Sequence, residues 1–196
     1  MKRVAIPVLL AFLAPVLLAA AQAPQDPLSA SLKALYDGVK RNVVESADKV
    51  PEADYAFKPT PEVRSFGELF GHIANSNFSS CARVKGEKNP NTGNDFEKTP
   101  TKAAIKKALA DSFAYCDGVY AAMTDAKALA PVPATAPSAP PAPGAKPAPP
   151  APPAARLLVS VVSHTNEHYG NLVTYMRLKG MVPPSTERTQ KPPVKN

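Results

Sequence analysis

Hydrophobic residues recur at helical spacing in four separate segments of the chain. The first segment covers residues 26–50, where Asp26 can cap a helix and Pro27 suits its first position. Apolar side chains three or four positions apart form one stripe along it: Leu28, Leu32, Leu35, Val39 and Val43. This spacing predicts an amphipathic helix with one face turned to a core.

A second helix is predicted from Ser65 to about Gly86, after an extended connector that contains three prolines. Ser65 followed by Glu68 three residues later has the pattern of a capping box. The expected inner stripe of this helix carries four apolar residues and one amide: Phe66, Leu69, Phe70, Ile73 and Asn77. The polar residues 88–100 that follow predict a loop.

Two further helices complete the pattern. The third begins at Thr99 and Pro100 and runs to about Lys127, with five residues along its inner face: Ile105, Leu109, Phe113, Cys116 and Tyr120. The fourth covers residues 154–179 and ends at Gly180. No β-strand signal of comparable length is present, so the sequence predicts an all-α protein, a four-helix bundle over residues 28–185.

A long alanine- and proline-rich tract, residues 131–153, precedes the last helix. Proline cannot donate a backbone hydrogen bond and clashes with a helix interior, so we expect a semi-extended, exposed loop here. Because only one helix follows, the tract is predicted to be a loop insertion within the bundle and not a domain boundary. Residues 186–196 are polar and rich in proline, and their composition predicts a disordered tail.

The first residues have the layout of a secretory signal peptide. Lys2 and Arg3 precede an apolar run over residues 4–18, and small residues follow. The run is too short for a good transmembrane span. We expect cleavage after Ala21, so that residues 1–21 are removed and the mature chain is exported to the periplasm or the extracellular space without a membrane span.

The charge and the two cysteines add separate constraints. The formal net charge is +7, and it falls to +5 once Lys2 and Arg3 are subtracted. The remaining basic residues are scattered, which argues against nucleic-acid binding. Cys81 and Cys116 lie in the second and third predicted helices, where an exported chain permits a disulfide between them. Two buried free thiols are the alternative.

The three histidines are all predicted to face inward. His164 and His168 are separated by about 400° of helical rotation, a net difference of about 40°, so both rings can reach one point. His72 lies beside the inner stripe of the second helix. Three nitrogen ligands leave at least one position open on a metal ion, which is typical of catalytic sites. The alternative is three core histidines, each paired with a backbone or hydroxyl group.

The segment HTNEH, residues 164–168, also fits the HxxEH pattern of inverted zinc proteases. Those enzymes use a downstream glutamate as the third ligand. After His168 only Glu187 remains, in a proline-flanked tail, and the chain is too short and too helical for that family. We therefore do not favour a protease.

A longer combination of motifs is more specific. RSFGELFGHIANSN, residues 64–77, and HTNEHYGNLVTYMRLKGMVPPS, residues 164–185, resemble the DinB-like (DinB/YfiT) superfamily of four-helix-bundle metalloenzymes. His72 matches the family's histidine near the start of the second helix. His164 and His168 match its HxxxHxGQ-like motif, and five residues match the ending: Arg177, Lys179, Gly180, Pro183 and Pro184. Asn171 stands where the family commonly has glutamine, and the proline tract is an unusual insertion.

The resemblance implies one divalent transition metal, zinc or nickel, held by the three histidines. Because some relatives are thiol-dependent S-transferases or isomerases, the resemblance also implies a thiol S-transferase type of reaction on a small-molecule substrate. Cytosolic thiols are not expected to be abundant outside the cell, so a metal-dependent hydrolase is the competing expectation for an exported chain. The alternative is a non-catalytic bundle, in which the metal is structural or which binds a partner. Whether the protein forms a homodimer is left open by the sequence. Four residues are candidates for the surroundings of the metal or for a pocket: Glu68, Asn75, Tyr169 and Asn171. For Glu68, closing the capping box with Ser65 is the alternative role.

Overall fold

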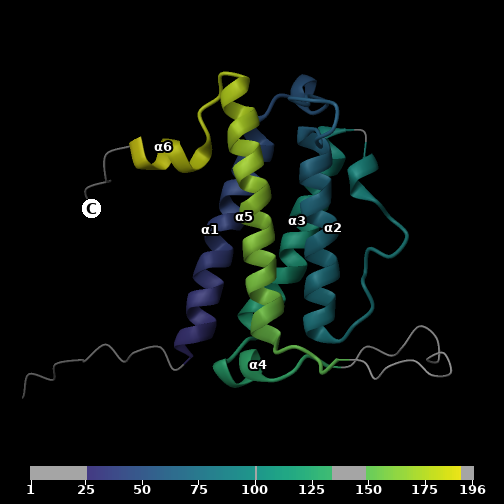
Figure 1. The fold of residues 1–196 in the computed structure, drawn as a ribbon, viewed down its shortest axis with the longest axis vertical. Helices are drawn as coiled ribbons and strands as arrows, with labels where there is room; N and C mark the ends of the chain where they lie inside the picture. Colours follow the sequence, from purple (N-terminus) through teal and green to yellow (C-terminus); the bar gives the residue numbers. More distant parts are fainter. Residues whose placement is uncertain (1–25, 100, 134–148, 191–196) are drawn as a thin grey trace, which may run out of the picture.

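Four long helices pack side by side in the computed structural model, which describes residues 26–99, 101–133 and 149–190 (Figure 1). The long helices are α1 (Pro27–Lys49), α2 (Phe66–Lys85), α3 (Lys102–Ala121) and α5 (Ala154–Leu178). Both α1 and α2 pack against α3 and against α5, so the four helices close a ring around the core. The predicted all-α bundle is confirmed for the described residues. None of the described helices combines the length and the apolar character needed to cross a bilayer.

Two short helices and two 3-10 turns join or extend the bundle. Helix α4 (Asp125–Leu129) follows α3, and helix α6 (Pro184–Gln190) follows α5. The turns are η1 (Glu52–Asp54), in the connector before α2, and η2 (Phe96–Lys98), in the loop before α3. The third helix was predicted to continue to about Lys127, but it ends earlier because Thr124 starts a new helix by accepting a hydrogen bond from the Lys127 backbone.

The inner stripes predicted for the second and third helices are buried, and so are three of the five residues predicted for the first: Leu32, Val39 and Val43. Leu28 is 37% exposed and Leu35 is 59% exposed, while Tyr36 is fully buried. The Tyr36 hydroxyl donates to the Phe113 carbonyl over 2.9 Å, on α3. The side of α1 that faces α3 is therefore centred on Tyr36, and the two leucines lie at its edge.

The N-terminal cap of α2 follows the prediction, whereas α1 begins at Pro27 as predicted but is not capped by Asp26. The Ser65 amide donates to the Glu68 carboxylate over 2.7 Å, and the Glu68 amide donates to the Ser65 hydroxyl over 3.2 Å, which closes the predicted capping box. Asp26 makes no side-chain cap on α1. Its carboxylate instead accepts from the Asp125 amide, and the Asp125 carboxylate accepts from the Ser29 amide, each over 2.8 Å. The two aspartates thus cap each other's helix.

The ends of the proline-rich tract are held together. Val132 donates to the Pro152 carbonyl and Ala154 to the Ala130 carbonyl, each over 2.9 Å. Pro131 and Pro153 form an isolated antiparallel bridge there. Residues 134–148 lie outside the described part, as do the predicted signal peptide and residues 191–196.

The disorder predicted from residue 186 is wrong for residues 186–190, which belong to α6. Arg188 of this helix contacts both Glu45 and Asn42 on α1, and Glu187 pairs with Lys49. Pro184 at the start of α6 is buried. Composition alone did not reveal this helix because its stability depends on partners about 140 residues away in the sequence.

A disulfide joins Cys81 on α2 to Cys116 on α3, with a Cα–Cα distance of 5.5 Å. Both residues are fully buried. Of the two alternatives that the sequence left open, the structure contains the disulfide. It fixes the distance between α3 and the helix that carries His72.

Candidate metal centre

The three histidines meet at the contact between α2 and α5. The Nε2 atom of His72 lies 3.0 Å from Nε2 of His164, which in turn lies 3.1 Å from Nε2 of His168. One ring nitrogen from each histidine lies within 4.8 Å of those of the other two. His168 is buried, and the other two are half-buried. The two elements therefore bring together the rings that the helical spacing predicted.

The chemistry of this cluster fits a cation better than a set of hydrogen bonds. A ring nitrogen either donates or accepts a single in-plane hydrogen bond, yet Nε2 of His164 contacts two other ring nitrogens. Among the described residues, none of the three rings pairs with a backbone or hydroxyl group. Nitrogens about 2.0–2.1 Å from a tetrahedral zinc ion lie about 3.3 Å apart, close to the separations observed. The donor set thus suits a transition metal.

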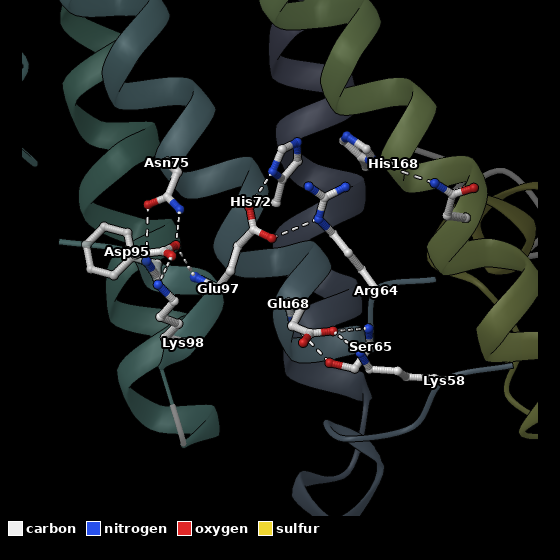
Figure 2. Close-up of polar contacts among 12 residues, drawn as sticks. Lys58, Arg64, Ser65, Glu68, His72, Asn75, Asp95, Glu97, Lys98 and His168 are labelled. Atoms are coloured by element: carbon white, nitrogen blue, oxygen red, sulfur yellow. Dashed lines mark hydrogen bonds and ion pairs between the residues drawn. The ribbon is translucent and has the colours of Figure 1, made fainter. Parts of the chain in front are cut away.

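A carboxylate that the sequence analysis missed orients one of the rings. Glu97, in η2, lies 2.6 Å from Nδ1 of His72 through Oε1 and accepts 2.8 Å from Nε of Arg64 through Oε2 (Figure 2). If Nδ1 donates to the carboxylate, Nε2 of His72 keeps its lone pair for a metal. Partial burial opposes ionisation of Glu97, but the hydrogen bonds from Arg64 and His72 outweigh it and lower the pKa of its carboxyl.

Burial keeps the rings on α5 neutral. Burial, and secondarily the neighbouring His164 and His72, lowers the pKa of His168 to about 4. Burial and His72 also lower the pKa of His164. At neutral pH the ring nitrogens therefore hold lone pairs and can act as ligands.

Gly71 and Asn75 hold the loop that carries Glu97 against α2. A Cβ atom at Gly71 would lie 2.3 Å from the Phe96 carbonyl oxygen, so only glycine admits this approach. The Asn75 amide nitrogen donates to Asp95 over 2.9 Å, and its oxygen accepts from the Phe96 amide over 3.2 Å (Figure 2). Asn75, a candidate for the pocket, thus anchors the loop and does not contact the histidines.

We expect Gly71→Ala to destabilise the protein by about 1–3 kcal/mol and to weaken metal binding. The new methyl group would push Phe96 away from α2 and carry Glu97 away from His72. Thermal denaturation and metal titration of the variant measure the two effects. Gly38→Ala is the matched control, because nothing lies within 4 Å of a Cβ at this position on α1. It should raise stability by about 0.5–1 kcal/mol. Equal behaviour of the two variants would contradict the argument.

A cleft of about 600 Å³ opens beside His168. Its wall comes from the connector before α2, from the first turn of α2, from η2 and from α5, and it includes Arg64, Glu68, Glu97, Glu167 and Asn171. The amide nitrogen of Asn171 lies 3.4 Å from Nδ1 of His168. Glu167 is an exposed part of this wall.

Two of the candidate residues serve other contacts. The Glu68 carboxylate closes the capping box and pairs with Lys58 over 2.8 Å, so it lines the cleft without contacting a histidine (Figure 2). The Tyr169 hydroxyl donates to the Ser185 hydroxyl over 2.7 Å. It therefore holds the segment after α5 and is not part of the cleft wall.

The chain is similar to known proteins in family and in fold. A sequence model of the DinB superfamily matches residues 35–172. The crystal structure of a DinB-like protein from Bacillus cereus ATCC 10987 is 12% identical in sequence, with a TM-score of 0.55. The alignment covers 79% of this chain and 95% of that one, and at this identity it shows a shared fold alone. No curated protein matches the chain.

Proposed function

The chain belongs to the DinB superfamily, and from this premise we propose that it is a metal-dependent enzyme. In this proposal His72, His164 and His168 hold one divalent transition metal, zinc or nickel, at the edge of the cleft. The observation that carries the proposal is the convergence of the three Nε2 atoms. Nε2 of His164 lies 3.0 Å from that of His72 and 3.1 Å from that of His168, and it cannot form a hydrogen bond with both.

The residues around the histidines would have different roles in such a site. Glu97 holds the His72 ring with Nε2 toward the other two rings. Three protein ligands leave one coordination position of the cation free. A cation held by the three histidines would polarise a substrate carbonyl at that position, or lower the pKa of a water or thiol bound there. Glu167, whose carboxylate makes no ion pair or hydrogen bond among the described residues, lines the cleft and is the group that we assign to accept a proton from the substrate.

The open position and the cleft support a hydrolase or a thiol S-transferase acting on a small molecule. One observation favours a second role, because the histidines join α2 to α5 and a metal there would also tie the two helices together. A purely structural metal would stabilise the bundle without turnover. Measurement of activity distinguishes the catalytic role from the structural role, whereas measurement of metal content does not, because both roles require the metal.

We also propose that the protein is exported. A buried disulfide between Cys81 and Cys116 supports this, because disulfides form and persist in oxidising compartments and are rare in the cytosol.

Elemental analysis of the untagged protein tests the metal centre. We expect about one transition-metal ion per chain in the wild type and none in His164→Ala/His168→Ala, since the variant keeps a single ligand. The intact mass of the same sample, from an exporting host, should correspond to a chain that begins at Gln22. Zinc or nickel is then added to the apoprotein, which is assayed on esters and amides with and without a low-molecular-weight thiol. Metal without turnover would favour the structural role, and no metal in either protein would overturn the proposal.

A further inference from the structure

Arg64 presents unused hydrogen-bond donors to the cleft. Its Nε donates to Glu97, and its two terminal nitrogens make no hydrogen bond to any described residue. The guanidinium lines the same cleft as His168, and in Figure 2 its terminal nitrogens turn away from Glu97, between His72 and His168.

The other cation of the cleft is already engaged. Lys58 pairs with Glu68 over 2.8 Å, so its ammonium group has a carboxylate partner within the wall. Arg64 also has a carboxylate partner in Glu97, but this contact uses only one of its five N–H donors. The side chain of Arg64 is 42% exposed, so the remaining donors can be reached from the cleft. A planar fork of donors of this kind matches the two oxygens of a carboxylate.

We propose that Arg64 binds a carboxylate group of the substrate, and hence that the substrate is a small molecule with a carboxylate at one end and its reacting group at the metal. This inference rests on the proposed function, because it uses the histidine centre as the second point of attachment. Two fixed points would orient the substrate along the cleft and place its reacting group beside Glu167.

The charges of the cleft favour a carboxylate over a phosphate. Four carboxylates line it, namely those of Glu62, Glu68, Glu97 and Glu167. Glu68 and Glu97 are paired with basic residues, whereas Glu62 and Glu167 have no ion pair among the described residues. A doubly charged phosphate group would be repelled by these carboxylates more strongly than a singly charged carboxylate.

Thiol probes on the cobalt(II)-substituted protein test the inference by binding and not by turnover. The thiol of 3-mercaptopropionate binds the cobalt and gives a charge-transfer absorption band, and its acid end is free to reach Arg64. The probe 3-mercaptopropanamide has the same length and thiol but no charge. Titration of each probe gives two dissociation constants, and their ratio is independent of how tightly the protein holds its metal.

We expect the preference for the acid over the amide to be about tenfold larger in the wild type than in Arg64→Gln, because the variant loses a charge-assisted pair of hydrogen bonds. The control is Lys58→Met/Glu68→Gln, which removes the other ion pair of the cleft without a change of net charge. Glutamine preserves the capping box in this control. The control should keep the wild-type preference, and melting curves of all three proteins establish that they are folded.

Three outcomes would overturn the inference. An unchanged preference in Arg64→Gln would show that this side chain only orients Glu97. Tighter binding of 2-mercaptoethylphosphonate than of 3-mercaptopropionate to the wild type would replace the carboxylate with a phosphate-type group. The absence of any cobalt–thiolate band would remove the second point of attachment and the inference with it, whereas elemental analysis tests the metal centre separately, which distinguishes this failure from failure of the proposed function.

Discussion

Breaking the Cys81–Cys116 disulfide is expected to lower the free energy of unfolding by about 4 kcal/mol, the value that loop-closure entropy predicts for a sequence separation of 35 residues. For a protein of this size, that loss corresponds to a decrease in melting temperature of roughly 8–16 °C. The measurement is thermal denaturation of the oxidised protein, of the reduced protein and of Cys81→Ala/Cys116→Ala. Reduction keeps both sulfur atoms in the core, so the reduced protein separates the cross-link from the packing of the side chains.

The double variant is also the control for the reductant. A thiol reductant should lower the melting temperature of the wild type and leave that of Cys81→Ala/Cys116→Ala unchanged. Metal content should survive in both, because Cys81 lies nine residues beyond His72, about 13 Å along α2. Equal melting temperatures of the oxidised and reduced wild type would contradict the prediction.

The difference between α2 and α6 shows which parts of the fold could be predicted. The inner stripe of α2 and its capping box depend on residues three or four apart, so local spacing is enough to find them. Helix α6 is held by Arg188 against Glu45, and its seven residues are too few to be stable alone. Leu35 was misplaced for a related reason, since the side of a stripe that is covered depends on where the neighbouring helix crosses it.

In the candidate site, too, some residues could be predicted from local spacing and others could not. The pair His164 and His168 follows from helical periodicity, and His72 follows from the stripe of a second helix. Glu97 carries no periodic signal, because it lies in an irregular loop that returns to α2 after 25 residues. The clue in the sequence was Gly71 beside His72, a glycine inside a helix whose missing side chain admits the Phe96 carbonyl.

Saturation with zinc is expected to raise the stability of the wild-type apoprotein by about 4 kcal/mol at a free zinc concentration about 1,000 times the dissociation constant. Glu97→Gln should lose about 10- to 100-fold in zinc affinity, since a neutral amide supports the His72 ring less well than a carboxylate. At the same zinc concentration this loss reduces the stabilisation by about 1.4–2.7 kcal/mol. His168→Ala should show no stabilisation by zinc at that concentration, because two histidines remain.

The graded order of these three proteins is what distinguishes an oriented metal centre from nonspecific binding. Glu68→Gln is the matched control, because Glu68 lines the same cleft, contacts no histidine and can be replaced by glutamine within the capping box. Its melting temperature should rise with zinc as much as that of the wild type, and a chelator should reverse the rise. If Glu97→Gln and Glu68→Gln responded alike, the contact between Glu97 and His72 would not contribute to metal binding. If His168→Ala still responded to zinc, the ion would lie elsewhere on the protein.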